Sequence, residues 1–421
     1  MSEASAPSPD SQSSQATPAT LFLVALIVFI DMLGIGLIIP VLPGLLEEVT
    51  GLGLDETAQI GGWLLFAYAS MQFLFAPIIG GLSDRYGRRP ILLFTLFMLG
   101  IDYIIMALAP TLFWLFLGRT LSGIMGASWA AANSCIADVA STETRGKYFG
   151  MLGAAGAAGF VVGPGLGGLL GTIDVRFPFV AAAILALSGA VAGYFVLKET
   201  LPDDRRRKFS FARANPLGTL MQMTRVPVVV GFLAVIFFAQ LGAQSHQTVW
   251  AYHTELVFGW DELQIGLSVA LFGIMLVIVQ GGLTGKVIER IGAGRTVMLG
   301  FAISLPANLL FAFAPAGYFM IIGIIIGATG GLTFPAMQQI MSARISEDAQ
   351  GELQGAIAST ISITSIIGPL IMTGTFAVYA DDEGLFFPGA PYLLAFLCGV
   401  TAMSIAFWNI RRSRAASAHA T

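Results

Sequence analysis

The segment GGLSDRYGRRP, residues 80–90, places three arginines and one aspartate inside an otherwise apolar sequence. Apolar runs flank it on both sides, and its glycines allow the tight turn that joins two antiparallel helices. Charged residues are costly inside a lipid bilayer, so this segment has to lie at a membrane surface. It predicts a short hairpin between two membrane-spanning helices.

The composition of the whole chain agrees with a membrane protein. Of its 421 residues, 56% are hydrophobic and 11% are charged, whereas a soluble protein has about 25% charged residues. Apolar runs of about 20 residues, the length that crosses a bilayer as a helix, recur along the chain. Since backbone groups in lipid must be satisfied inside each segment, these runs predict helices. We expect an all-α membrane protein with about twelve transmembrane helices.

The spans divide into two halves that repeat. RGKYFG at 145–150 corresponds to QGELQG at 350–355, and VVGP at 161–164 corresponds to IIGP at 366–369. Two six-helix bundles related by an axis along the membrane normal are a known transporter architecture, with binding between the halves. The expected organisation is a disordered N-terminal tail at 1–19, bundles at 20–197 and 226–410, a cytoplasmic linker at 198–225 and a C-terminal tail at 411–421.

The loop charges predict the orientation of the chain. Lys and Arg fall in loops on one side, and the opposite loops hold only Arg176 and are acidic, with Glu47, Glu48, Glu255 and Glu262 among their residues. Because positively charged loops stay in the cytoplasm, both termini are expected to be cytoplasmic.

Three ionisable residues fall deep inside predicted spans: Asp31, Asp102 and Arg119. A charge at the bilayer centre costs about 2.5–3.5 kcal/mol, so such residues normally face a cavity or a partner. Two acids against one arginine leave one carboxylate without a dedicated cation, and burial favours its protonation. We expect Asp31 or Asp102 to exchange a proton in an aqueous crevice, and Arg119 to hold or release the other acid. The alternative is an Asp–Arg pair that only ties helices together.

The hairpin and its surroundings predict a gate at the cytoplasmic rim. Asp84 can meet Arg145 or a helix N-terminus, and Asp138 can meet Arg88. A solvated surface that only sets the topology is the alternative interpretation. The residues assigned to the gate are Gly81, Asp84, Arg85, Gly87, Arg88, Arg89, Asp138 and Arg145.

The run GAAGAAGFVVGPGLGG at 153–168 is unusually rich in glycine for a helix. Small residues let membrane helices pack closely, and Pro164 predicts a kink. We weigh close packing equally against a hinge or seal formed by Gly159, Gly163, Pro164 and Gly167. The run lacks the Lys-Ser/Thr ending of a nucleotide-binding loop.

Neutral polar side chains within the spans are candidates for contact with a substrate, although each could instead hold helices together. The candidates are Gln72, Trp129, Asn133, Gln240, Gln244, Gln280, Asn308 and Gln338. His246 and His253 have no spacing that suits a metal, so no metal site is predicted. An enzyme is not predicted either, because no nucleophile is clustered with a base.

These motifs resemble the major facilitator superfamily, in particular its twelve-span drug:proton antiporters and the tetracycline efflux proteins. GGLSDRYGRRPILL is similar to the loop between spans two and three, LGRTLSGIMGA to the arginine motif of span four, and GFVVGPGLGG to the antiporter motif of span five. DMLGIGLIIPVLP and TFPAMQQIMS resemble the tetracycline branch. This branch has a histidine where the chain has Leu276 and an aspartate where it has Ser304.

The resemblance implies a monomeric, multi-pass protein of the bacterial inner membrane that exports a small amphipathic drug in exchange for protons by alternating access. Tetracycline is a candidate cargo, and a divalent metal carried with it stays open. The resemblance implies no ATP, organic cofactor or nucleic acid. It also implies that Asp31, Asp102 and Arg119 are functional, that Asp84, Arg88 and Asp138 form the cytoplasmic gate, and that Gln240 and Gln280 line the substrate path. The alternatives are transport of another small metabolite, or an importer or sensor with the same fold.

Overall fold

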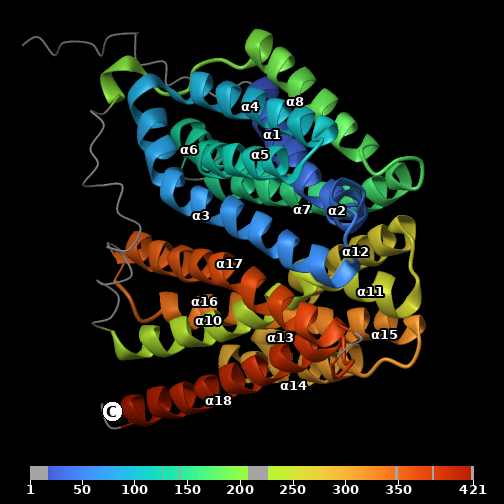
Figure 1. The fold of residues 1–421 in the computed structure, drawn as a ribbon. Coiled ribbons are helices and arrows are strands. Elements are labelled where there is room, and N and C mark those ends of the chain that lie inside the picture. The colour runs from blue at the N-terminus through green and yellow to red at the C-terminus, as the bar shows by residue number, and fades with distance from the viewer. Residues whose placement is uncertain are drawn as a thin grey trace, which may run out of the picture.

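The computed structural model describes residues 18–126, 128–141, 144–206, 226–346, 349–381 and 384–418. Most of the predicted N-terminal tail and linker lie outside these residues. The described segments are helical and joined by short connections (Figure 1).

Two groups of helices follow one another along the chain. The first comprises α1 (Pro18–Ile38), α2 (Leu42–Thr50), α3 (Leu54–Tyr86), α4 (Arg88–Leu108), α5 (Leu112–Met125), α6 (Ser128–Val139), α7 (Arg145–Gly171) and α8 (Phe177–Val196), followed by the short 3₁₀ turn η1 (Asp203–Arg205). The second comprises α10 (Pro227–Thr248), α11 (Trp250–Phe258), α12 (Glu262–Val277), η3 (Ile278–Leu283), α13 (Thr284–Ile291), α14 (Ala293–Ala312), α15 (Gly317–Gly327), η4 (Ala328–Leu332), α16 (Thr333–Ser342), α17 (Gln350–Ala380) and α18 (Ala390–Ala418).

Eleven stretches of helix in the described residues are long and apolar enough to cross a membrane. The predicted span 112–137 accounts for a twelfth, but it is divided into α5 and α6 around Gly126. Nε2 of Gln72 donates a hydrogen bond to the carbonyl of Gly126 at 2.9 Å. A carbonyl freed by a break in a membrane helix needs such an internal donor, because lipid supplies none.

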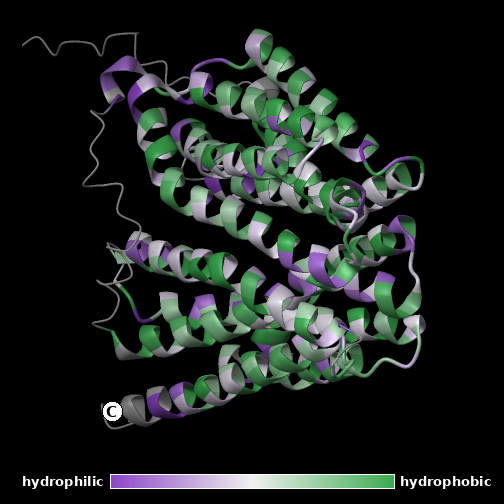
Figure 2. Ribbon diagram, in the orientation of Figure 1, coloured by the Kyte–Doolittle hydropathy of each residue, from purple (hydrophilic) through white to green (hydrophobic). Residues whose placement is uncertain are grey.

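Hydrophobic residues predominate along the helices of both bundles (Figure 2), and many large apolar side chains are exposed on the outside. Large side chains such as Phe195 and Leu108 are 79% and 72% exposed. In water such a surface would drive association, but in a bilayer it contacts acyl chains without penalty. The chain is therefore a multi-pass membrane protein of two six-helix bundles, as the sequence predicted.

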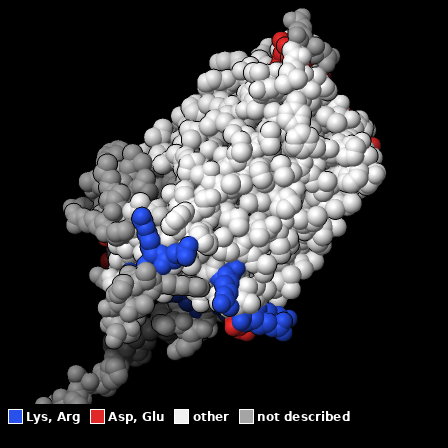
Figure 3. Space-filling view, turned by 90° about the horizontal axis from the view of Figure 1, so that it is seen from below, with Lys and Arg blue, Asp and Glu red and all other residues white. Residues whose placement is uncertain are grey.

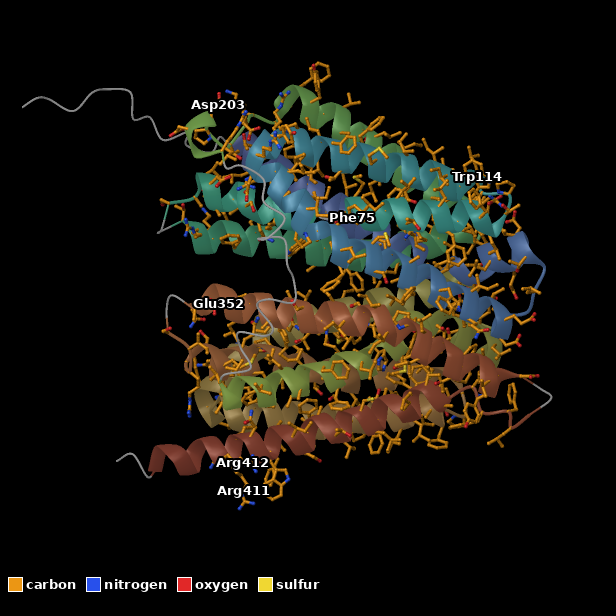
Figure 4. All side chains as sticks on the ribbon, turned by 60° about the vertical axis from the view of Figure 1, so that its left-hand side comes forward. Phe75, Trp114, Asp203, Glu352, Arg411 and Arg412 are labelled. Carbon is orange, nitrogen blue, oxygen red and sulfur yellow. The ribbon has the colours of Figure 1, made fainter. Side chains whose placement is uncertain are left out.

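The two ends of the bundles differ in charge. Figure 4 places Asp203, Glu352 and Arg411 at one end and Trp114 at the other. We call the end that carries Arg88 and Arg411 the basic end, and the opposite end, which carries Glu47 and Glu255, the acidic end. Figure 3 shows Lys and Arg gathered toward one end of a face that is otherwise largely uncharged.

The bundles pack against each other at the acidic end and diverge toward the basic end (Figures 1 and 4). α7 packs on α12, and α3 packs on α17 and α11. An apolar cluster draws from both bundles. Its buried members are Ala58, Val249, Tyr252, Met372, Phe376 and Ala380.

Glycines bring the α7 and α12 backbones together. A Cβ at Gly266 would strike the carbonyl of Pro164, and one at Gly168 would strike the carbonyl of Glu262. α7 is one helix of 27 residues that runs through Pro164. The glycine-rich run is thus compatible with a helix because tight packing against α1 and α12 compensates for the low helix propensity of glycine.

Widening this contact should open the acidic end. We call the contact between the two bundles at the acidic end the seam. Gly266→Val places extra methyl groups between α7 and α12, which should destabilise the closed seam by about 1–3 kcal/mol. We expect the reaction of Ala58→Cys with a membrane-impermeant maleimide to become about tenfold faster, in a protein whose Cys135 and Cys398 are replaced by alanine. Gly153→Val is the control, because nothing lies within 4 Å of a Cβ at that position. Equal rates in the two valine variants would contradict the close packing.

Candidate functional site

Two of the predicted ionisable residues, Asp31 and Arg119, line a pocket inside the first bundle. The pocket is small, with a cavity volume of about 20 Å³ between α1, α3, α4 and α5, which is room for about one water molecule. Its lining residues are Asp31, Ile35, Tyr68, Thr95, Leu96, Leu99, Tyr103, Arg119, Ser122, Met125 and Gly126.

Asp102 and Arg119 form a buried ion pair. Nη2 of Arg119 donates to Oδ2 of Asp102 at 2.7 Å. Asp102 is fully buried and Arg119 is 8% exposed. Gly118 makes room for the carboxylate, because a Cβ there would lie 2.7 Å from Oδ1 of Asp102. In this environment each charge requires the other, because an unpaired buried charge is strongly destabilising.

The ion pair does not use all of its hydrogen-bonding groups. Oδ1 of Asp102 and Nε of Arg119 are buried and have no hydrogen-bond partner among the described residues. A buried polar group without a partner costs about 1–3 kcal/mol. Within the part of the chain that the structure describes, Oδ1 of Asp102 therefore lacks a donor, and Nε of Arg119 lacks an acceptor.

Asp31 approaches the same pocket from α1. Its side chain is largely buried, and it shares the lining with Arg119. Residues 31, 102 and 119, far apart in sequence, thus converge on one site. The proton-carrying role that the sequence assigned to them stays a prediction.

Two tyrosines that sequence reasoning did not select complete the pocket. The Arg119 guanidinium lies 5.9 Å from the centroid of the Tyr68 ring. Nε2 of Gln72 donates to the Tyr68 hydroxyl at 3.1 Å. Gly34 leaves room for Tyr103, whose hydroxyl would collide with a Cβ there. The spacing in the sequence could have indicated Tyr68, because Tyr68 and the candidate Gln72 are one helical turn apart and therefore lie on the same face of the helix.

At the basic end, the buried Arg88 connects three helices. Its Nη1 lies 2.6 Å from Oδ1 of Asp84, and its Nε donates to Oδ2 of Asp138 at 2.9 Å. The contact predicted between Asp138 and Arg88 is therefore present. Asp84 pairs with Arg88 rather than Arg145, whose Nη2 donates to the carbonyl of Ala137 at 3.4 Å.

The remaining hairpin residues support the turn. Gly87 has a φ of 106°, a conformation that glycine adopts without strain. Arg89 donates to the carbonyl of Tyr194 at 2.6 Å, and the guanidinium of Arg85 lies 5.0 Å from the centroid of the Tyr86 ring.

Glu199 is a residue of this network that sequence reasoning missed. Its carboxylate accepts hydrogen bonds from the backbone N–H groups of Arg88 at 2.8 Å and Arg89 at 3.3 Å. It also accepts from the N–H groups of Thr200 and Leu201. A negative charge at the N-terminus of α4 is favourable, because the first N–H groups of a helix lack partners. Glu199 thus fastens the start of the linker to the hairpin.

The structure does not gather the predicted substrate contacts into the Asp31 pocket. Nδ2 of Asn133 donates to the carbonyl of Trp129 within α6. Nε2 of Gln244 reaches Oγ of Ser365 at 3.5 Å, and Nε2 of Gln338 donates to Gln354 at 3.4 Å.

The other second-bundle candidates occupy separate positions. Gln240 is half-buried on α10, one turn before Gln244, and Asn308 lies beside His246. Gln280 is exposed on η3, which is a π-helical turn. The eight candidates are therefore distributed over both bundles, and their role in substrate binding stays a prediction.

Two irregular turns face each other in the second bundle. The π-helical η3 packs against η4, a 3₁₀ turn. A Cβ at Gly331 would lie 2.8 Å from Cδ1 of Leu276, and one at Gly330 would lie 3.3 Å from Oγ of Ser304. Irregular backbone at membrane depth is tolerated where it is buried in protein or lines a cavity, and π-helical turns are frequent at functional sites. Leu276 and Ser304, the two positions expected from the sequence to differ from the tetracycline branch, therefore lie beside these irregular turns.

Comparison with known proteins agrees with this architecture. A sequence profile of the Major Facilitator Superfamily matches residues 24–283 and 232–421. The chain belongs to the Major Facilitator Superfamily. It is therefore a membrane transporter with a small-molecule substrate.

Relatives within the superfamily include tetracycline resistance proteins. The class C protein of Escherichia coli is 40% identical over 354 residues, which cover 84% of this chain and 89% of the relative. The class H protein of Pasteurella multocida is 35% identical over 401 residues, covering 94% and 97% of the two chains.

A solved structure of a bacterial homologue of the human lysosomal transporter Spinster, in an inward-facing, occupied conformation, has a TM-score of 0.77. Its sequence is 17% identical, and the match covers 94% of this chain and 98% of that one. This similarity supports the fold of the transporter.

The Glu199 contacts predict a stability effect. Glu199→Ala leaves the N–H groups of Arg88 and Arg89 without their acceptor, at a cost of about 1–3 kcal/mol. We expect the midpoint of thermal unfolding in detergent to fall by several degrees. Glu289→Ala, at an exposed acid on α13, is the matched control. If both alanine variants melted alike, the carboxylate of Glu199 would not stabilise the hairpin.

Proposed function

We propose that this transporter is a drug efflux antiporter of the bacterial inner membrane, in which inward proton movement drives the export of a small amphipathic molecule. The observation that carries the proposal is that Asp31 and Arg119 line one pocket and that Arg119 is paired with the buried Asp102. Intramembrane acids are expensive and normally mark proton or ion pathways. The names of the relatives support drug efflux and make a tetracycline-like molecule the first cargo to test.

The proposed orientation places the basic end in the cytoplasm, as the positive-inside rule requires. The bundles are joined at the acidic end, so the conformation described above is open toward the cytoplasm. In this state the pocket is ready to release a proton inward and the space between the bundles is ready to receive cargo. Transport then requires the acidic end to open and the basic end to close.

The coupling depends on competition for Arg119. When both acids are ionised, one guanidinium has to stabilise two carboxylates at a site from which water is largely excluded. A proton on one carboxylate oxygen removes one of these charges, so the arginine pairs fully with the other acid. We assign Asp31 and Asp102 as the exchanging acids and Arg119 as the residue that alternately holds and releases them.

The Arg88 network serves as the cytoplasmic gate in this proposal. Asp84, Arg88 and Asp138 fasten α3, α4 and α6 to one another within the first bundle. The Asp84 side chain remains 44% exposed. It can therefore contact the second bundle when the basic ends approach.

If Asp31 and Asp102 couple transport to protons, replacing either acid should greatly reduce gradient-driven efflux and preserve the exchange of cargo for cargo. In Asp102→Asn and Asp31→Asn, tetracycline should still exchange for tetracycline across the membrane, because exchange of cargo for cargo requires no proton. Efflux driven by a pH gradient should fall at least tenfold, a loss of about 1.4 kcal/mol or more of coupling. Drug-dependent dissipation of the pH gradient in everted vesicles, followed with a fluorescent pH probe, measures the coupled step.

The matched control is Asp203→Asn, at a highly exposed acid in the basic-end loop. Gradient-driven efflux that persists in both intramembrane variants would refute proton coupling through these residues. Uptake of drug by intact cells along the gradient would instead indicate an importer. A drug-susceptibility panel in a pump-deficient host would identify the cargo class.

A further inference from the structure

The acidic end contains a set of carboxylates that the proposed transport cycle does not use. Glu47 lies on α2 of the first bundle, and Glu255 and Glu262 lie on α11 and at the start of α12 of the second bundle. All three side chains are half-buried. They border the contact between the bundles, since Glu262 packs on Gly168 and Gly171 of α7.

The cations of this region are already engaged. Arg176 donates to Glu48 at 3.0 Å and to the carbonyls of Ala107 and Ala109. The charged groups that act electrostatically on Glu255 are Glu47 and Glu262, both acidic. The neighbouring first turn of α3 adds Asp55 and Glu56, and the α12 N-cap residue Asp261 is engaged with Gln264. Closing the seam therefore brings like charges from opposite bundles together.

Burial in this closed seam changes the acidity of Glu255. Burial, followed by the charges of Glu47 and Glu262, raises the pKa of Glu255 to about 7 from its ordinary value of 4.5. Burial also raises the pKa of Glu47. Both groups lie beyond the ends of the membrane-spanning segments.

A second observation points to the same place. Tyr252, one turn before Glu255 on α11, is 3% exposed, and its hydroxyl has no hydrogen-bond partner among the described residues. The hydroxyl is pressed against Gly61 of α3, beside Leu46 of α2. A buried hydroxyl without a partner makes the closed seam less stable than its apolar cluster alone would make it.

From this geometry we infer that Glu255 is a second proton-binding group, which takes up a proton when the two bundles close at the acidic end. With the orientation of the proposed function, this proton comes from the external solution. Closure after release of the cargo would then require a proton from outside, which is the direction that antiport demands. The site deepens the proposed function because it links the outer gate to the driving ion.

The linkage fixes the sign of the pH dependence. The pKa of Glu255 is higher in the closed seam than in a solvated, open one, so protonation favours closure. This stabilisation is complete below the ordinary pKa of about 4.5 and is lost as the pH rises to about 7. Within this window the ratio of closed to open molecules changes by at most about tenfold for each pH unit.

The test measures the distance across the seam without cargo or a gradient. Spin labels are attached to Leu52→Cys and Val257→Cys, two exposed positions on opposite bundles, after Cys135 and Cys398 are replaced by alanine. We expect pulsed EPR of the purified protein to show a closed population that decreases from pH 4.5 to pH 7. In Glu255→Gln the decrease should be much smaller, because the uncharged amide imitates the protonated acid and only Glu47 still titrates with a raised pKa.

Two further variants make the result specific. In Glu47→Gln the closed population should be lost at a lower pH than in the parent, because this variant removes a charge that raises the pKa of Glu255. Glu48→Gln, at the acid paired with Arg176, should leave the transition unchanged. The inference is overturned if the distances do not depend on pH, or if Glu255→Gln titrates like its parent. Since the measurement involves no transport, a pH-dependent seam together with failed antiport would reject the proposed function and keep this site.

Discussion

The buried ion pair between Asp102 and Arg119 is the interaction on which the ionisable pocket of the first bundle depends. A charge held away from water must find its partner inside the protein, since the bilayer offers neither solvation nor a counter-ion. Gly118 gives the carboxylate its space, Tyr68 lies beside the guanidinium, and Asp31 lines the same pocket. This pair joins α4 to α5, and it leaves Oδ1 of Asp102 and Nε of Arg119 without hydrogen-bond partners among the described residues.

Polar and charged groups also find their partners within the protein at the ends of the molecule. At the basic end, Glu199 supplies the acceptor that the α4 N-terminus lacks, and Arg88 finds Asp84 and Asp138. At the acidic end, glycines bring backbones into contact and an apolar cluster closes the seam. The carboxylates beside that cluster work against the closure. A transporter needs two conformations of similar free energy. At this seam the apolar cluster favours closure and the carboxylates oppose it, so the two contributions offset each other.

Much of the fold could be predicted from the sequence because hydropathy, helix length and loop charge are local properties. The division of span 112–137 at Gly126 could not be predicted, since it depends on a hydrogen bond from Gln72, 54 residues away. The contact of Asp138 with Arg88 could be predicted because both residues lie at the same membrane depth. Glu199 was missed because its partners are 110 and 111 residues distant. Most substrate candidates were chosen by their polarity, which does not distinguish a cavity-lining amide from one that joins helices.

The sequence by itself determined that this chain spans a membrane many times, that it contains a repeat, and that a few charged residues lie inside the membrane-spanning segments. These conclusions follow from the cost of placing polar groups in lipid, which applies residue by residue. Only the tertiary structure decided which charges meet, which end of the bundles is closed, and that carboxylates of both bundles converge at the acidic seam. Those outcomes depend on how helices distant in sequence pack against one another, and packing is decided by shape as well as by hydropathy.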